Sequence, residues 1–420
     1  MNIQDIITII DFLLWLIIAA NVTYVLFFGL ASHLPKRNHF PSAILRPFGS
    51  KRAEPERRHQ TSDIRHQPSF LVLIPAYHED TVIINTVESF LLQDYPQDFY
   101  QLCVISDHME ATTNEKLAAL PITLLQPIFE QSSKAKALQY AISNFQHSSF
   151  NFQFPNYVVI LDADNIVAKD FLSRLSQIVR PDIVIQCHRT AKNADNDIAA
   201  LDGLSEEINN SIFRRGHNRI GLSSALIGSG MCFNYEWFKN NVNKLDSAVE
   251  DRELEALLMK QGIYIHYAED IPVMDEKVSN SDNFQRQRLR WMSGQVQALF
   301  QMLPYIPKAI FTGNINYIDK TIQQALIPRS ILLALIPLLC VIATTSTYIF
   351  HLPSSIIHLK WWYLFVMLCI ALYLAIPKRM RQQSLLRKFN SLPTLAWKML
   401  QNIMKIDHNN KEFIHTTHEK

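Results

Sequence analysis

The sequence feature that most constrains the fold is an apolar run near the amino terminus. Phe12 to Ala31, FLLWLIIAANVTYVLFFGLA, has no charged side chain over twenty residues. A run of about this length is enough for a helix to cross the hydrocarbon core of a bilayer. No basic stretch precedes it and no A-x-A motif follows it, so we expect an uncleaved anchor rather than a signal peptide.

Two more uncharged runs lie near the other end of the chain, Ile331 to Phe350 and Trp361 to Pro377. The sequence therefore predicts one amino-terminal and two carboxy-terminal transmembrane helices. Helices buried in a large soluble core are the alternative interpretation, but such helices are usually shorter.

The basic residues that flank these runs indicate an orientation. Lysines and arginines are frequent after the first run, between residues 36 and 65, and after the third, between 378 and 387. Basic residues accumulate on the cytosolic side of a membrane. We therefore expect an integral protein of a plasma membrane, such as the bacterial inner membrane. Its central region would be cytosolic and its amino terminus outside.

The composition excludes several other classes of protein. The net charge is only +2, so no overall field favours binding to nucleic acid. The five cysteines lie far apart and form no CxxC pair, which makes a zinc site or a disulfide framework unlikely and favours a reducing compartment.

These patterns divide the chain into six predicted regions. They are an anchor (1–32), a basic juxtamembrane linker (33–68), a catalytic domain (69–295), interfacial helices (296–327), a transmembrane helix pair (328–377) and a basic amphipathic cytosolic tail (378–420). The linker's charges would be attracted to anionic lipid.

Strand-like and helix-like segments alternate after residue 69. Apolar runs cover 70–77, 101–107 and 157–164, and segments with helical spacing cover 81–93, 132–145 and 170–179. Such alternation predicts an α/β fold with a parallel sheet covered by helices on both faces. Ligands of such sheets bind at the carboxyl ends of the strands.

A pair of aspartates ends the third of these apolar runs. Asp162 and Asp164, in LDAD, are two residues apart, so in a strand their side chains would leave the same face. Two close carboxylates repel each other unless a cation lies near them, and Mg²⁺ or Mn²⁺ prefers such oxygen ligands and shares them with phosphates. The alternative is a strand-end or helix-cap role.

Further charged residues are predicted at the same edge. Asp107 ends one strand and Glu79 follows another, where both could meet a ribose or a base, or could cap the next helices. Lys134 begins a predicted helix, where its charge and the helix amino terminus could bind a phosphate. A solvated lysine is the alternative.

A second acidic pair, Glu250 and Asp251, opens a helical segment in SAVEDREL. One of the two could act as a general base on an acceptor hydroxyl. Acids that stabilise a helix amino terminus are the alternative. In LIGSGMCF, Gly228 and Gly230 flank Ser229 and would let a ligand approach the backbone, although a plain turn also explains them.

The segment NFQRQRLRWMSGQ, residues 283–295, combines arginines with a tryptophan just before the chain becomes apolar. On a helix, Gln287, Arg290, Trp291 and Gly294 share one face. Arg290 can bind a phosphate through two parallel hydrogen bonds, and Trp291 offers a flat surface to a sugar ring. Arg286 and Arg288 are expected to face solvent or lipid.

With these motifs the chain resembles membrane-bound family-2 glycosyltransferases with a GT-A catalytic domain. It is similar to the branch of the cellulose, hyaluronan and poly-N-acetylglucosamine synthases, and to the ceramide glucosyltransferases. The resemblance covers roughly residues 70–295 and the flanking membrane helices. The motifs IPAYHED, ISD, LDAD, VED and QRLRW occur in the family's order, and match P-A-Y-N-E, the nucleotide aspartate, D-x-D, T-E-D and Q-x-x-R-W.

The resemblance implies a role for each matching residue. The donor nucleotide and diphosphate would be bound by Ala76, Tyr77, Glu79, Asp107, Lys134, Asp162, Gln287 and Arg290. Asp164 and Asp162 would bind Mg²⁺ or Mn²⁺. Asp251, beside Glu250, would be the catalytic base. The acceptor would lie near Trp291, Gly228, Ser229 and Gly230. The implied reaction is inverting transfer of a hexose from a nucleotide-diphosphate sugar, of the UDP class, to a polysaccharide or lipid-linked acceptor at the cytosolic membrane face, with export subunits as further partners.

The chain also departs from the family pattern. His78 replaces asparagine, Val249 replaces threonine before the acidic pair, and Ser133 replaces glycine before Lys134. Only two predicted helices follow the catalytic domain, so a single transfer to a glycolipid is an alternative to processive synthesis. The tail FIHTTHEK resembles a segment that closes over the nucleotide in some relatives, although a disordered end is favoured.

Three other classes of function compete with this one. A nucleotidyl- or phosphotransferase would use the same carboxylates but would have no need of Gln287, Arg290 and Trp291 on one helix face. An inactive membrane scaffold disagrees with the full set of acids. A transporter disagrees with spans that hold no charged residue.

Overall fold

The computed structural model describes residues 3–37, 67–147, 155–193, 196–247, 249–277, 281–349 and 355–381. Most of the predicted basic linker lies outside these residues, as does the tail with Thr416, Thr417 and His418. The strands are β1 (Phe70–Tyr77), β2 (Tyr100–Asp107), β3 (Thr123–Leu125), β4 (Tyr157–Ile160), β5 (Ile166–Val167), β6 (Ile183–Ala191), β7 (Met231–Asn234) and β8 (Tyr264–Asp275).

The helices begin with α1 near the amino terminus and end with α15. They are α1 (Ile3–Ala31), α2 (Ile83–Phe90), α3 (Ala111–Ala118), α4 (Lys134–His147), α5 (Phe171–Ile178), α6 (Asp197–Asn209), α7 (His217–Ile220), α8 (Tyr235–Asn241), α9 (Glu250–Lys260), α10 (Ser281–Met302), α11 (Ile306–Phe311), α12 (Ile315–Ala325), α13 (Arg329–Ile349), α14 (Ser355–Ala375) and α15 (Lys378–Arg381). The 3₁₀ helices η1 (Gln97–Phe99), η3 (Val242–Lys244) and η4 (Leu303–Tyr305) and the π-helix η2 (Asn210–Gly216) connect them.

The strands form one mixed sheet in the order β3-β2-β1-β4-β7-β6-β8-β5. β1 pairs in parallel with β2 and β4, β2 with β3, and β6 with β8. β7 runs antiparallel to β4 and β6, and β5 runs antiparallel to β8. The predicted α/β fold with a mostly parallel sheet is confirmed.

Helices cover both faces of this sheet, each over its own apolar core. Val72 and Ile74 of β1 pack with α2 and α5 in one core, whereas Leu71 and Leu73 pack with α4, α8 and α9 in the other. Successive residues of a strand point to opposite faces, so β1 contributes to both cores. This explains why its sequence is apolar at nearly every position.

The carboxyl ends of the central strands meet at one edge of the sheet. Tyr77 pairs with Asp107 at the ends of β1 and β2. Helix α4, which follows β3, starts at Lys134, and the backbone N–H of Lys136 donates to Ser133 Oγ at 3.2 Å. Ser133 therefore caps this helix.

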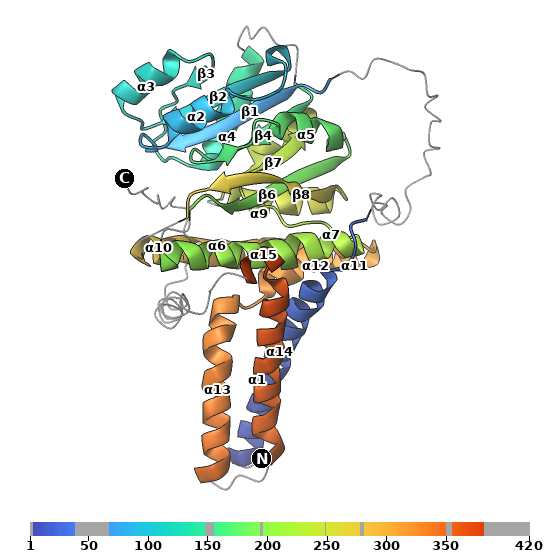
Figure 1. Cartoon of the computed structure of the whole chain (residues 1–420). Coiled ribbons are helices and arrows are strands. Elements are labelled where there is room, and N and C mark those ends of the chain that lie inside the picture. Colours follow the sequence, from blue (N-terminus) through green and yellow to red (C-terminus); the bar gives the residue numbers. More distant parts are fainter. Residues whose placement is uncertain are drawn as a thin grey trace.

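A layer of nearly horizontal helices separates the sheet domain from three upright helices (Figure 1). The layer contains α6, α7, α10, α11 and α12, and the upright helices are α1, α13 and α14. The region predicted as interfacial, 296–327, contains the end of α10, α11 and α12, and α10 continues across residue 295.

Two helices are long and apolar enough to be candidate membrane spans, Asp5–Ala31 and Arg329–Ser346, in the part of the chain that the structure describes. The apolar part of α14, Leu359–Ala375, is shorter than either of these two candidate spans. The three helices share a buried apolar cluster, and many of their remaining large apolar side chains are exposed. Exposed apolar surface of this extent is typical of a contact with membrane or with a partner.

The first of these helices packs directly on the sheet domain. His217, fully buried, stacks on Phe28 of α1 with ring centroids 3.6 Å apart and an angle of 4° between the rings. A side chain at Gly216 would overlap the carbonyl oxygen of Phe28, so only glycine allows this approach. The contact fixes α1 against η2 and α7.

Candidate active site

A cavity of about 1250 Å³ extends from the carboxyl ends of β1 and β2 to the helices α13 and α14. It brings together residues that are far apart in the sequence. Thirteen of the predicted site residues line it: Ala76, Tyr77, Glu79, Asp107, Lys134, Asp162, Asp164, Gly228, Glu250, Asp251, Gln287, Arg290 and Trp291.

Ser229 and Gly230, which were predicted to contact an acceptor, do not line this cavity. The Ser229 side chain is fully buried, and its hydroxyl donates to Asn165 Oδ1 and accepts from the backbone N–H of Asp162 at 3.3 Å. Gly230 packs against Val273 and Cys187 of the neighbouring strands. Of the three residues, only Gly228 lines the cavity, and Ser229 and Gly230 lead from it into β7, which begins at Met231.

Lys134 lies at the centre of the acidic groups. Its Nζ is 2.5 Å from Asp162 Oδ1, 2.7 Å from the carbonyl oxygen of Gly228 and 3.5 Å from Glu250 Oε1. Burial lowers the pKa of this amine, but Asp162 and Glu250 outweigh that effect and raise the pKa above its ordinary value. The lysine is therefore held charged among the carboxylates.

The D-x-D acids lie in a turn rather than in a strand, because β4 ends at Ile160. The N–H of Asn165 donates to the Asp162 carbonyl at 3.1 Å, and Asn165 Oδ1 accepts from the N–H of Asp162 at 2.9 Å. The predicted strand to residue 164 is thus wrong in its last four residues. The turn still carries both carboxylates to the cavity.

The two carboxylates fit a divalent cation that is shared with a bound phosphate. Asp164 is held by hydrogen bonds from Asn165 Nδ2 at 3.0 Å and from the N–H of Glu276 at 2.8 Å. Burial raises the pKa of Asp162, but the positive charges of Lys134 and Arg189 lower it by a larger amount. The pKa therefore lies below its ordinary value, and this acid stays ionised. Among the described residues no cluster of three or more metal-ligating side chains occurs, and Mg²⁺ commonly uses one or two carboxylates together with substrate phosphates.

The second acidic pair opens α9 beside this group. Glu250 Oε1, Asp251 Oδ2 and Lys134 Nζ all lie within 4 Å of the place where a Cβ on Gly228 would be. Asp251 Oδ1 accepts from the N–H of Arg252 at 2.8 Å, which leaves Oδ2 towards the cavity. Burial and the charge of Asp251 raise the pKa of Glu250 to about 7, against the effect of Lys134.

This raised pKa predicts a pH-dependent gain in stability for Glu250→Gln. The ordinary pKa is 4.5, so between about pH 4.5 and pH 7 the folded state binds more protons than the unfolded state, and stability falls as the pH rises. Glutamine does not ionise, so the variant does not lose this stability as the pH rises. We expect thermal unfolding to show a gain of about 1–3 kcal/mol at pH 8 and little change at pH 4.5. Glu236→Gln, at an exposed site on α8, is the control, and equal gains at both pH values would contradict the assignment.

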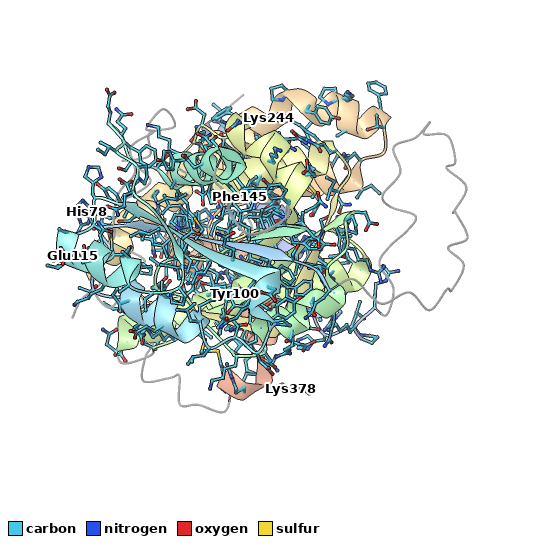
Figure 2. The ribbon with its side chains drawn as sticks, turned by 90° about the horizontal axis from the view of Figure 1, so that it is seen from above. His78, Tyr100, Glu115, Phe145, Lys244 and Lys378 are labelled. Carbon is cyan, nitrogen blue, oxygen red and sulfur yellow. The ribbon has the colours of Figure 1, made fainter. Side chains whose placement is uncertain are left out.

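Two histidines, His78 and His108, directly follow β1 and β2 at the carboxyl ends of these strands. His78 and His108 have positive φ angles of 53° and 54°, which are uncommon for residues other than glycine. His108 Nδ1 lies 2.6 Å from Asp107 Oδ1, and the rings of Tyr77 and His78 lie 4.5 Å apart. His78 lies at the rim of the domain when seen from above (Figure 2). No sequence motif contains His108, so its position beside Asp107 could not be predicted.

Helix α10 presents Gln287, Arg290 and Trp291 to the cavity, as their spacing predicted. Burial lowers the pKa of Arg290, whereas the negative charges of Glu250, Asp162 and Asp251 raise it. Arg290 lines the same cavity as these three acids. The buried Oε1 of Gln287 has no hydrogen-bond partner within the described part of the chain.

The expectation that Arg288 faces solvent or lipid is wrong. Its guanidinium binds Asp202 of α6 and lies over the rings of Phe284 and Trp291, with Cζ 4.8 Å and 4.6 Å from the two ring centroids. The reason is that α6 packs over this part of α10, which no local pattern reveals. Arg286 is exposed, as expected.

Gly294 fits closely against the residue that precedes the acidic pair. A Cβ at Gly294 would overlap both methyl groups of Val249. We expect Gly294→Ala to displace α10 from α9, to lower stability by about 1–3 kcal/mol and to reduce activity through Asp251 and Arg290. Adding Val249→Ala should restore both, because it removes the overlapping methyl groups. Unfolding and activity measurements on the two single variants and the double variant test this, and additive losses would contradict it.

One charged group near the site has no counterpart in the predicted motifs. Arg189 of β6 lines the cavity and donates from Nε to Asp275 Oδ2 at 2.7 Å, and Lys277 Nζ lies 2.5 Å from Glu206 Oε2. All four side chains are buried or nearly so. The positive charge of Arg189 helps to keep Asp162 ionised. No local pattern predicts this role, because Arg189 and its partner Asp275 are 86 residues apart.

Comparison with known proteins identifies a family for most of the catalytic region. The family model described as "Glycosyltransferase like family 2" matches residues 67–294, more than half of the chain. No protein of curated function matches in sequence.

Similar solved structures include a mannosyltransferase from Pyrobaculum calidifontis in complex with GDP-Man and Mn²⁺, at 16% identity and a TM-score of 0.43, covering 74% of this chain and 86% of that one. TarS 1–349 of S. aureus in complex with UDP-GlcNAc has 13% identity and a TM-score of 0.38, with 80% and 89% covered. Glucosyl-3-phosphoglycerate synthase from Mycobacterium tuberculosis, with Mn²⁺, UDP and phosphoglyceric acid, has 15% identity and a TM-score of 0.37, with 54% and 76% covered.

Proposed function

Since the chain belongs to the family-2 glycosyltransferases, we propose that it transfers a hexose from a nucleotide-diphosphate sugar, of the UDP class, to a lipid-linked or polysaccharide acceptor. The observation that carries this proposal is the convergence of Asp162, Asp251 and Arg290 on one cavity. Such a transfer needs one acid that binds a cation, a second acid that acts as a base, and a guanidinium that binds the diphosphate.

The donor would bind over the carboxyl ends of β1 and β2. Tyr77, Glu79 and Asp107 line that end and would hold the nucleoside. Lys134 and Arg290 would bind the diphosphate, together with Gln287, whose orphaned Oε1 would accept a donor hydroxyl. A divalent cation at Asp162 and Asp164 would neutralise charge on the leaving diphosphate.

The acceptor hydroxyl would be activated by Asp251. Its Oδ2, which lies beside Gly228, takes the proton as the hydroxyl oxygen attacks the anomeric carbon from the face opposite the diphosphate, so the configuration inverts. Trp291 would border the acceptor sugar from α10. A single transfer and a processive reaction both begin with this step.

The site would work at the cytosolic face of a membrane. The apolar helices α1 and α13 are candidate spans, and basic residues follow the first of them in the sequence. Under the positive-inside rule the amino terminus would lie outside and the sheet domain in the cytosol, at the bacterial inner membrane. The cavity's continuation to α13 and α14 would let an acceptor approach from the membrane side, and export subunits would be needed for a polymer.

A panel of nucleotide sugars tests the proposed function. The purified full-length protein is given each donor with Mg²⁺ or Mn²⁺ and a membrane lipid extract, and release of the nucleoside diphosphate and the product mass are measured. We expect one donor class to be consumed and its hexose to appear on an acceptor. Release of a nucleoside monophosphate and a sugar phosphate would instead indicate a phosphotransferase.

A further inference from the structure

The lower part of the cavity is an apolar space among the upright helices. Its wall contains Val25 of α1, Leu333 and Pro337 of α13, and Phe365 and Leu372 of α14. Because these helices carry the candidate spans, this part of the cavity would lie within the membrane. A hydrocarbon chain suits its chemistry.

Three arginines stand where this apolar part meets the catalytic part of the cavity. Arg214 of η2, Arg288 of α10 and Arg329 of α13 all line the cavity, and their charges are close enough to act on one another. Arg329 donates to the carbonyl of Ser205 at 3.1 Å and to Asn209 Oδ1 at 2.6 Å, both of which are neutral. Three positive charges from three elements thus gather at the junction.

The acids nearby do not fully balance these charges. Asp202 pairs with Arg288, and Glu206 is engaged by Lys277 at 2.5 Å. Arg214 is only 4% exposed, and its Nε and that of Arg288 are buried without a hydrogen-bond partner in the described residues. Burial lowers the pKa of Arg214 below its ordinary value despite Glu206, so the charge is incompletely compensated.

We propose that this junction binds the phosphate or diphosphate of a lipid-linked sugar, whose hydrocarbon chain occupies the apolar part of the cavity. The inference rests on the proposed function and names its acceptor class. Arg288 also lies over the Trp291 ring, so a sugar joined to the bound phosphate would reach the surface predicted for the acceptor. In the reaction, the sugar's hydroxyl oxygen bonds to the donor's anomeric carbon, the bond from that carbon to the diphosphate breaks, and Asp251 takes the proton.

Lipid binding to the purified full-length protein in detergent tests the inference without requiring turnover. The probes are decaprenyl phosphate, decaprenol and inorganic phosphate. We expect decaprenyl phosphate to bind at least about tenfold more tightly than decaprenol, because charge-assisted bonds to phosphate are strong. Arg329→Gln and Arg214→Gln should each remove about tenfold of that preference, whereas Arg286→Gln, exposed on α10, should leave it unchanged.

Equal affinity for decaprenyl phosphate and decaprenol would overturn the inference, and this comparison needs only the wild-type protein. Displacement of the lipid by inorganic phosphate at a similar concentration would indicate a site for a free anion and would overturn the lipid assignment. Consumption of the nucleotide sugar by the same sample reports on the proposed function separately. Donor consumption without preference for the phosphorylated lipid would therefore contradict this inference alone.

Discussion

Replacing Asp251 by asparagine is expected to abolish sugar transfer while leaving donor binding almost unchanged. Asparagine has nearly the same shape but cannot take the proton of the acceptor hydroxyl, and general-base assistance contributes roughly two to four orders of magnitude. Oδ2 of Asp251 faces the cavity beside Lys134, where an acceptor would meet it. The measurements are the turnover number with a saturating acceptor and the donor dissociation constant by calorimetry.

A matched variant separates this effect from a change in the fold. Asp246→Asn alters an exposed aspartate shortly before α9 and should keep wild-type turnover. If Asp251→Asn also turned over at the wild-type rate, Asp251 would not be the base.

Replacing Arg290 by lysine is expected to reduce transfer by about one to three orders of magnitude, even though the charge is kept. A guanidinium can hold two oxygens of a diphosphate at once, whereas an ammonium acts as a point charge. Stabilisation of the departing diphosphate by such donors is worth several kcal/mol in comparable sites, roughly 3 kcal/mol for a single donor. The loss should appear in kcat, measured with saturating donor.

The control for this variant lies one helical turn earlier on the same helix. Arg286→Lys changes an exposed arginine that contacts Asn283 and should have little effect. Full activity in Arg290→Lys would indicate that this arginine anchors the helix at an interface and does not bind the donor.

The parts of this fold that the sequence predicted well depend on local patterns. β1 and β2 could be predicted as continuous apolar runs, because both of their faces are buried, and α4 and α5 could be predicted from the helical spacing of their apolar residues. Asp107 and Lys134 reach the same edge because parallel strands end together. The face of α10 with Gln287, Arg290 and Trp291 follows from the geometry of one helix.

Features that depend on contacts between distant segments were not predicted. β7 is inserted antiparallel between β4 and β6, and this buries Ser229 behind the cavity wall. Arg189 donates to Asp275 on β8, and Arg288 donates to Asp202 on α6. Only the tertiary fold brings the two members of each pair together, so neither pair could be predicted from the sequence. The D-x-D turn differs from a strand because Asn165 hydrogen-bonds back to Asp162, which the alternation of apolar residues does not reveal.

The most direct test of the central claim is an experimental structure of the protein with a UDP-sugar and Mn²⁺. We expect the nucleoside at the carboxyl ends of β1 and β2, the cation at Asp162 and Asp164, and the diphosphate within hydrogen-bond reach of Arg290. The acceptor face of the sugar should turn towards Asp251. A donor bound elsewhere, or a diphosphate that Arg290 does not reach, would contradict the claim that these residues form one transfer site.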